Sequence, residues 1–209
     1  ETAAVPVVAH LDHGHSIDEC RMALDAGFTS LMFDGSNLPL AQNIEATAAV
    51  AELARKAGAS CEGEIGFVGY AGGVDSIGTD PEEAARFARE TGVDAMAISI
   101  GNLHLQQVSG ARLDIARLRS IEALTDVPLV IHGGSGVATA ERKELSANTH
   151  ICKFNIGTEL RMAFGAALRE AVERDPTRFD RIAILKETEP GVMTAARAVF
   201  LCLGASGRV

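Results

Sequence analysis

Three histidines in this sequence have the residue type and the placement expected of metal ligands. His13, His104 and His132 each follow a short apolar segment. Three protein ligands with one open coordination position are the set that a catalytic zinc ion uses, and neutral imidazole suits zinc. The other nitrogen of each ring then needs an acceptor, for which Glu64, Asp34 or backbone carbonyls are available. We therefore expect a metal centre, and a purely structural role for the three histidines is the alternative.

An acidic side chain comes directly before the first of these histidines. Asp12 can exchange a proton with a substrate, because a strand end would hold its carboxylate in place. A hydrogen-bonded strand end without catalytic function would give the same pattern. His10 lies earlier in the apolar segment, which indicates a hydrogen-bonded interior histidine, and His15 precedes the expected helix start at Ser16, which indicates a loop residue.

Two glycine-rich turns could bind an anion. Each follows an apolar segment and leads into a helical pattern, so free backbone N–H groups and hydroxyls could bind a phosphate group. Either turn alone is commonly a tight connection, but two of them beside a metal centre favour a phosphate ester as substrate. The residues expected to bind it are Gly133, Gly134, Ser135, Asn155, Gly157 and Thr158.

The elements that must position these side chains alternate along the chain. Six nearly continuous apolar segments are typical of strands in a parallel sheet covered by helices; they occupy residues 5–10, 28–33, 60–65, 95–100, 128–131 and 151–156. Amphipathic segments lie between them, with expected helix starts at Ser16, Asn37 or Pro39, Asp80 and Thr139 and expected C-caps at Gly27, Gly58 and Gly92.

This alternation is compatible with an open doubly wound sheet or with a closed (β/α)8 TIM barrel. Polar residues follow strand after strand, which favours the barrel, because its βα loops converge on one face. A complete barrel takes roughly 250 residues, whereas this chain has 209 residues and six expected strands. We therefore predict an α/β fold in which residues 1–209 form a single barrel domain, apparently without its first two βα units.

Composition limits the partners and the compartment. A formal net charge of −9 argues against binding to nucleic acid or to an anionic membrane surface, since both need a cationic surface. No run of about 18 apolar residues and no leader pattern is visible. The widely spaced cysteines, in apolar surroundings, are expected to be reduced core thiols of a cytoplasmic protein; they are Cys20, Cys61, Cys152 and Cys202.

With these residues in place, the chain closely resembles the class II, metal-dependent ketose-bisphosphate aldolases, the family of fructose- and tagatose-bisphosphate aldolases. The resemblance runs from Val5 to the end of the chain, and several motifs recur in the family's order and spacing. The motifs are HLDHG, AGFTSLMFDGSNLP, EGEIG, TDPEEAARFARETGVDAMAISIG, IHGGSG and KFNIGTELR. The resemblance places the first predicted strand near the family's third strand.

The resemblance implies metal-dependent aldol cleavage of a ketose bisphosphate to dihydroxyacetone phosphate and an aldehyde. It makes His13, His104 and His132 zinc ligands and Asp12 the proton donor and acceptor, with Glu64 and Asp34 as acidic residues beside the metal. Gly133, Ser135, Asn155 and Thr158 would hold the phosphate of dihydroxyacetone phosphate. A monovalent cation and a homodimer or homotetramer are further expectations from the family.

Two local departures concern substrate binding. Leu105 stands where the family usually has glycine directly after the second zinc histidine, and residues 66–73 lack acidic residues that many relatives carry. These departures, with the missing units, motivate one alternative, a non-catalytic aldolase-like subunit. A second alternative is a metal-free Schiff-base aldolase that uses Lys153 as its amine. Arg161 could bind a second substrate phosphate or lie at the surface.

Overall fold

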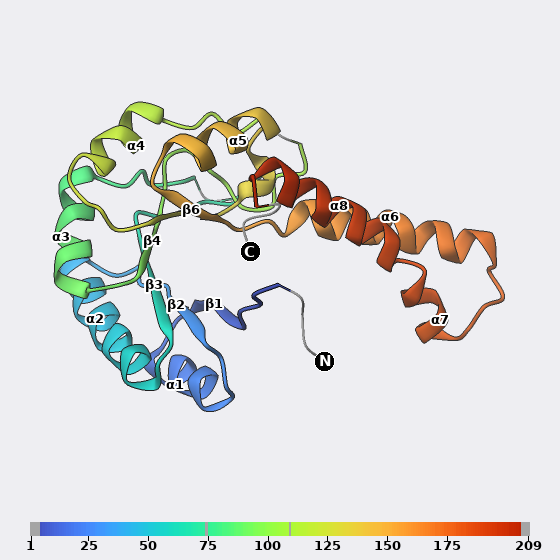
Figure 1. Ribbon diagram of the computed structural model, residues 1–209, viewed down its shortest axis with the longest axis horizontal. Helices are drawn as coiled ribbons and strands as arrows, with labels where there is room; N and C mark the ends of the chain where they lie inside the picture. The colour runs from blue at the N-terminus through green and yellow to red at the C-terminus, as the bar shows by residue number, and fades with distance from the viewer. Residues whose placement is uncertain (1–4, 74, 109, 206–209) are drawn as a thin grey trace.

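The computed structural model describes residues 5–73, 75–108 and 110–205. Six parallel strands form one curled sheet, with helices on its outer side (Figure 1). The strands are β1 (His10–Gly14), β2 (Ser30–Phe33), β3 (Ser60–Ile65), β4 (Ala95–Ile98), β5 (Leu129–Ile131) and β6 (Ile151–Phe154). The helices are α1 (Ile17–Asp25), α2 (Leu40–Ala57), α3 (Pro81–Thr91), α4 (Ile115–Glu122), the 3₁₀ turn η1 (Gly134–Gly136), α5 (Thr139–Asn148), α6 (Thr158–Arg174), α7 (Arg181–Lys186) and α8 (Glu189–Cys202).

The strand order distinguishes the two predicted architectures. The strands pair in strict chain order from β1 to β6, and every pairing is parallel. A doubly wound sheet would reverse its order at a switch point, and this sheet does not. The predicted fold class is therefore confirmed: the chain forms six successive βα units of a TIM-type barrel, and β1 and β6 are the two edges of the sheet.

Local sequence explains where the first helices begin and end. Ser16 forms a capping box with Glu19, since each side chain accepts a hydrogen bond from the other residue's backbone. Asp80 caps α3, which has Pro81 in its first turn. Gly58 ends α2 in the left-handed conformation, which glycine adopts at little cost.

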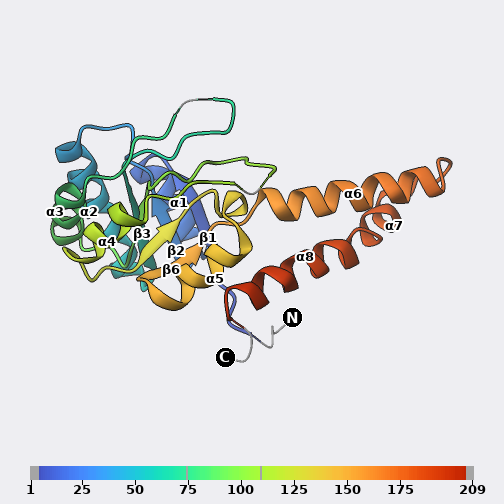
Figure 2. The ribbon, with the colours of Figure 1, turned by 90° about the horizontal axis from the view of Figure 1, so that it is seen from above.

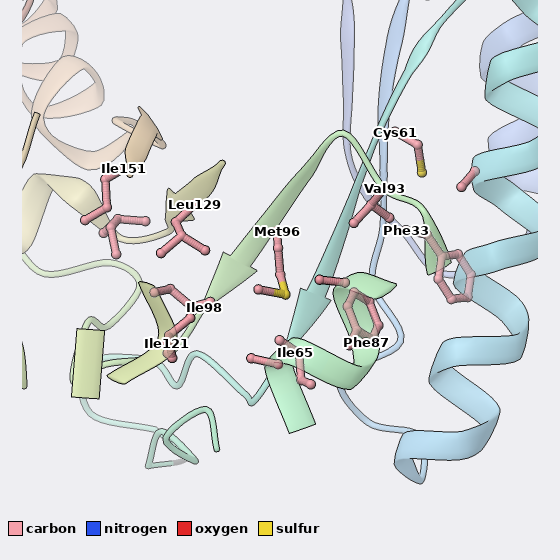
Figure 3. Close-up of a cluster of buried hydrophobic side chains, with 14 of the residues drawn as sticks. Phe33, Cys61, Ile65, Phe87, Val93, Met96, Ile98, Ile121, Leu129 and Ile151 are labelled. Carbon is pink, nitrogen blue, oxygen red and sulfur yellow. The ribbon is translucent and has the colours of Figure 1, made fainter. Parts of the chain in front are cut away.

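The main core lies between the sheet and the outer helices (Figure 3). Outward-facing strand residues such as Phe33, Ile65 and Met96 pack there against helix residues such as Phe87. On the inner side of the sheet, the described residues form a small apolar cluster of Met32, Ala97 and Val130, with Ala95 beside it. The rest of the inner side is therefore available to polar side chains.

The first strand does not lie where the apolar pattern placed it. β1 is residues 10–14 instead of 5–10, and Val7 and Val8 are exposed. Hydrogen bonding to the next strand begins only at the carbonyl of Ala9, so the preceding apolar residues have no strand beside them in this structure. The motif HLDHG is consequently the strand itself and does not follow it.

Smaller differences affect the other predictions. The strands expected at residues 28–33, 95–100, 128–131 and 151–156 are one or two residues shorter, whereas Ser60–Ile65 matches. Cys20 and Cys61 are buried free thiols as predicted, but Cys152 is exposed and Cys202 is half-buried. The prediction was wrong for Cys152 because Leu129 pairs with Ile151 and Val130 with Lys153, so Cys152 is an extra residue in β6.

Helices α6, α7 and α8 form an arm that extends from the barrel (Figures 1 and 2). α6 and α8 pack along each other. Large apolar side chains of the arm remain exposed, among them Phe179, Ile182, Met193 and Phe200. Within the described ranges, no helix combines the length and apolar character needed to cross a membrane.

Candidate metal centre and phosphate site

A bulge in the first strand directs His13 into the site. Leu11 pairs with Leu31 and Gly14 with Phe33, so β1 contains one more residue than β2 across this interval. His13 adopts a left-handed backbone with a φ of 57°. β-bulges re-aim side chains beside functional sites, and such a conformation in a non-glycine residue costs free energy. The strained backbone therefore holds the His13 ring in a fixed direction.

The three predicted metal ligands lie together. The centroid of the His13 ring is 4.8 Å from that of His132 and 5.5 Å from that of His104, and the last two are 5.7 Å apart. Their ligand nitrogens all lie within 4.8 Å of one another. The residues come from three different strand ends, which is why only the fold brings them together.

Two of these rings have one nitrogen, here called the outer nitrogen, that contacts a carboxylate, and a second, inner nitrogen that faces the other histidine. His13 Nδ1 lies 2.7 Å from Asp34 Oδ2, and His132 Nε2 lies 3.0 Å from Glu62 Oε1. Since an ionised carboxylate only accepts hydrogen bonds, these nitrogens carry the protons in the neutral rings. This arrangement orients a metal-binding histidine and makes its other nitrogen more basic.

The inner nitrogens then face each other. His13 Nε2 and His132 Nδ1 are 3.1 Å apart, and in the neutral rings both present a lone pair. Two nitrogens bound to a tetrahedral zinc ion at about 2.0–2.1 Å would lie roughly 3.3 Å apart. The donor set and its spacing therefore fit a metal ion, because a shared cation removes the repulsion between the lone pairs.

Electrostatics around His13 also favour a cation. Burial lowers the pKa of His13, but its hydrogen bond with Asp34 and the charge of Glu64 outweigh this effect and raise the pKa. Burial opposes ionisation of Asp34, yet hydrogen bonds from His13 and Ser36 hold the pKa of Asp34 below its usual range. A fixed negative charge thus lies directly behind the first ligand.

Glu64 lies next to both His13 and His132. Its Oε2 atom is 3.9 Å from the Nδ1 atoms of His13 and His132 and lacks a hydrogen-bond partner among the described residues. Burial, and then the charge of Asp34, raise the pKa of Glu64 to about 8. A buried oxygen atom without a partner is costly, and a cation close to Asp34 and Glu64 would offset that cost.

His104 is positioned by backbone contacts and by an aromatic ring. Its backbone N–H donates to the carbonyl of Gly69 at 2.8 Å, and its backbone carbonyl accepts from the N–H of Ala71 at 3.0 Å. The Tyr70 ring stacks on His104 with centroids 4.9 Å apart and an interplanar angle of 27°. Burial, and then the two neighbouring histidines, lower the pKa of His104 to about 4, so the ring is neutral at physiological pH, the form that a metal ion would need.

Sequence reasoning missed Glu62. Its buried carboxylate accepts from His132 at 3.0 Å and from Lys153 Nζ at 2.8 Å. Burial opposes ionisation of Glu62, but His132 and Lys153 lower its pKa overall. The signal was the spacing in β3, because residues two apart in a strand share a face and Glu62 lies on the same face as Glu64.

Lys153 and His10 contact the same network. The ammonium of Lys153 is engaged with Glu62, whereas a Schiff-base lysine needs a neutral amine. His10 Nδ1 lies 2.7 Å from the Ser30 hydroxyl, and its Nε2 is 4.0 Å from Glu62 Oε2. The His10 side chain is 18% exposed, and its Nε2 has no hydrogen-bond partner among the described residues, so only its Nδ1 has the hydrogen bond that the sequence indicated.

Asp12 lies at the entrance to the site. Its side chain is 58% exposed, Oδ1 accepts from the Asn155 side chain at 3.1 Å, and the same atom is 4.0 Å from His13 Nε2. Asn155 Nδ2 also lies 3.2 Å from His132 Nε2. Asn155 was expected to bind phosphate, and the structure places its side chain between the predicted acid and His132, a predicted metal ligand.

The remaining predicted phosphate residues form a pair of adjoining turns. Gly134 N–H donates to the carbonyl of Asn155, and Glu159 N–H donates to the Ser135 hydroxyl at 3.2 Å. Helix α6 begins at Thr158, and its N-cap Gly157 makes no side-chain capping bond. The Ser135 hydroxyl proton and the start of α6 are available to an anion, although the amides of Gly134 and Glu159 are already bonded.

Arg161 and Leu105 border this region. Arg161 is exposed, and it lines a cleft of about 400 Å³ that Asp12, Lys153 and Asn155 also line. Leu105 is 51% exposed and has a φ of 59°. The backbone at this position is thus left-handed, the conformation for which glycine is the natural choice.

The fold and the site together define a class of protein: an α/β barrel that brings three histidines, a set able to hold a metal ion, together at the carboxyl ends of its strands. A family model described as "Fructose-bisphosphate aldolase class-II" matches residues 1–208. The chain belongs to the class II fructose-bisphosphate aldolase family, whose members are lyases.

Named relatives differ in the substrate given in their names. The chain is 36% identical over 209 residues to the fructose-bisphosphate aldolase of Geobacillus stearothermophilus, covering 98% of this chain and 72% of that relative. It is 40% identical over 188 residues to the 6-phospho-5-dehydro-2-deoxy-D-gluconate aldolase of Shouchella clausii, covering 88% of this chain and 63% of that relative. The family is thus established, and the names of its members include two different substrates.

Solved structures agree with the barrel fold. The crystal structure of the YdjI aldolase from Escherichia coli is similar with a TM-score of 0.78 and 31% identity, covering 99% of this chain and 72% of that chain. Fructose-bisphosphate aldolase from Campylobacter jejuni is similar in fold, with a TM-score of 0.78 at 22% identity and coverage of 96% and 71%.

Proposed function

We propose that this chain carries the metal-dependent aldol cleavage site for a phosphorylated ketose, with zinc as the metal. The observation that carries the proposal is the pair of inner nitrogens of His13 and His132, 3.1 Å apart, each on a ring whose other nitrogen is held by a carboxylate. Three imidazoles favour zinc over the harder cations. When bound, a divalent ion at this centre would supply Lewis-acid stabilisation of negative charge on the substrate oxygens.

Asp12 is the residue proposed to move the proton. In cleavage, the proton of the substrate C4 hydroxyl passes to the Asp12 carboxylate while the C3–C4 bond breaks. The electron pair of that bond stays with the dihydroxyacetone phosphate half, which takes up one proton at C3 while Asp12 later releases the proton it accepted, and the other fragment leaves as an aldehyde. Asn155 donates to Asp12 Oδ1, so it stabilises the charged carboxylate and fixes its direction.

The substrate is proposed to have an anionic group at each end. The turns around Ser135 and Thr158 would hold the phosphate of the dihydroxyacetone phosphate half. Arg161 lines the cleft that contains Asp12, and its guanidinium is the proposed ligand of the second anionic group. Fructose and tagatose bisphosphates fit this description, as does 6-phospho-5-dehydro-2-deoxy-D-gluconate, named for one relative.

The proposal also covers assembly and compartment. Exposed apolar side chains on the arm, including Phe179 and Phe200, support a homodimer or homotetramer, because large apolar surfaces often mark contacts between subunits. The free cysteines support a reducing compartment such as the cytoplasm. Neither a nucleic acid nor a membrane is proposed as a partner.

The experiment that tests the function combines metal analysis with turnover. We expect about one zinc per chain by elemental analysis, cleavage of at least one of the three substrates, and loss of cleavage after chelation with recovery on adding zinc. Asp12→Asn should retain zinc and lose at least about 100-fold in kcat, whereas His104→Ala should lose tight zinc binding. Normal turnover by Asp12→Asn would remove Asp12 from its role.

The two alternatives give different results in the same experiment. Zinc without turnover on any substrate would indicate a non-catalytic aldolase-like subunit. Borohydride trapping of substrate on Lys153, with turnover that resists chelation, would indicate the Schiff-base mechanism. The bond between Lys153 and Glu62 opposes this second alternative.

A further inference from the structure

A buried arginine lies directly behind the proposed phosphate site. Arg142 is in α5, and its side chain is 5% exposed. Its Nη1 donates to Glu159 Oε2 at 2.9 Å, while its Nε is buried without a hydrogen-bond partner in the described parts of the chain. Burying an arginine is costly unless its charge is used, so its position calls for a function.

The partner of Arg142 lies in the first turn of α6. The backbone N–H of Glu159 donates to the Ser135 hydroxyl, so Glu159 joins the two turns that form the phosphate site. Its side chain joins the same region to α5 through Arg142. One residue thus connects Ser135, the start of α6 and the buried guanidinium.

A carboxylate at this position conflicts with an anion site. The N-terminus of a helix attracts negative charge, and an acidic side chain in the first turn competes with a bound phosphate for the same N–H groups and repels it. The ion pair with Arg142 neutralises Glu159 and holds its carboxylate on the α5 side. Arg142 and Glu159 also line a cleft of about 290 Å³ together with Ser135 and Gln106.

We propose that Arg142 is a positioning residue of the phosphate site, which neutralises Glu159 and fixes the first turn of α6 against the Ser135 turn so that a phosphate group can bind. The inference rests on the proposed function in that the phosphate belongs to the substrate. It goes beyond that function by giving a role to a residue that touches neither the metal centre nor the predicted acid.

The test measures phosphate binding directly, with inorganic phosphate as the probe in isothermal titration calorimetry on the metal-loaded chain. We expect Arg142→Met to weaken phosphate binding about tenfold, because Glu159 is then an uncompensated charge beside the anion. The double variant Arg142→Met with Glu159→Gln should recover to within about threefold of the original affinity, and Arg142→Lys should lose less than Arg142→Met. Arg86→Met, which removes an exposed pair with Glu90 on α3, is the matched control and should change nothing.

Kinetics supply a second readout. If cleavage occurs, Arg142→Met should raise KM for the phosphorylated substrate while kcat changes by less than about twofold. Unchanged phosphate affinity in Arg142→Met, or no recovery in the folded double variant, would overturn the inference. If Arg142→Met does not fold, the comparison of Arg142→Lys with the double variant decides in the same way.

The two proposals can fail separately. Absence of cleavage by a chain that binds phosphate and shows the charge rescue would reject the aldolase reaction and retain the role of Arg142. Cleavage by a chain in which Arg142→Met changes neither phosphate binding nor KM would retain the aldolase reaction and reject the role of Arg142. Failure of the original chain to bind inorganic phosphate at all would reject the positioning role.

Discussion

Replacing Gly133 tests whether the turn after β5 and the loop that carries His104 must touch. Gly133 has a φ of 63°, and a Cβ atom added there would lie 2.0 Å from the carbonyl oxygen of Leu103 and 3.1 Å from the backbone nitrogen of His104. The obstacle is backbone, so rotation of a side chain cannot relieve it. Gly133→Ala therefore forces either the turn or the His104 loop to move.

The expected cost has two parts. An alanine in the left-handed region costs about 1–2 kcal/mol, and forcing an extra carbon into a filled space typically costs about 1–3 kcal/mol. Gly133→Ala should thus reduce the free energy of unfolding by about 2–5 kcal/mol. Because the contact is next to His104, zinc affinity should fall as well.

Urea unfolding followed by circular dichroism measures the first effect, and competition with a chromophoric chelator measures the second. The matched control is Gly110→Ala. The Gly110 N–H donates to the carbonyl of Gly136, which lies in the turn that contains Gly133, and a Cβ atom added at Gly110 would meet nothing within 4 Å. The control should change stability by less than about 1 kcal/mol. Equal stability and equal zinc affinity of the two variants would refute the close contact between turn and loop.

Two further predictions concern the loops around His104. Leu105→Gly should stabilise the chain by about 0.5–1 kcal/mol, because the relief of left-handed strain exceeds the cost of the added flexibility in the unfolded chain. The control, Leu38→Gly, is at an exposed position without a positive φ and should destabilise the chain. If urea unfolding ranks the two variants the other way, Leu105 is not strained. Tyr70→Ala should weaken zinc binding about tenfold by removing the ring that supports His104, whereas Tyr70→Phe keeps the stacking and should change it less than about twofold. Equal zinc affinity of the two Tyr70 variants in a chelator competition would show that the stacked ring does not position His104.

The order and type of the main barrel elements could be predicted from the sequence. Nearly continuous apolar segments indicate buried parallel strands, and caps such as Ser16 and Asp80 act over three residues, so they need no tertiary information. The same local reasoning located the histidines and the glycine-rich turns at strand ends. It failed for residues 5–10, because an apolar segment becomes a strand only where another strand pairs with it.

The geometry of the site depended on contacts between distant segments. The direction of His13 depends on a bulge that exists only in register with β2, and Asp12 contacts Asn155 across 143 positions of the chain. Glu62 supports His132, and Arg142 pairs with Glu159, through side chains whose residue types are usually found on surfaces. Sequence patterns report which residues face the core, whereas hydrogen bonds and charge pairs between strands depend on distances of a few ångströms that only the folded chain determines.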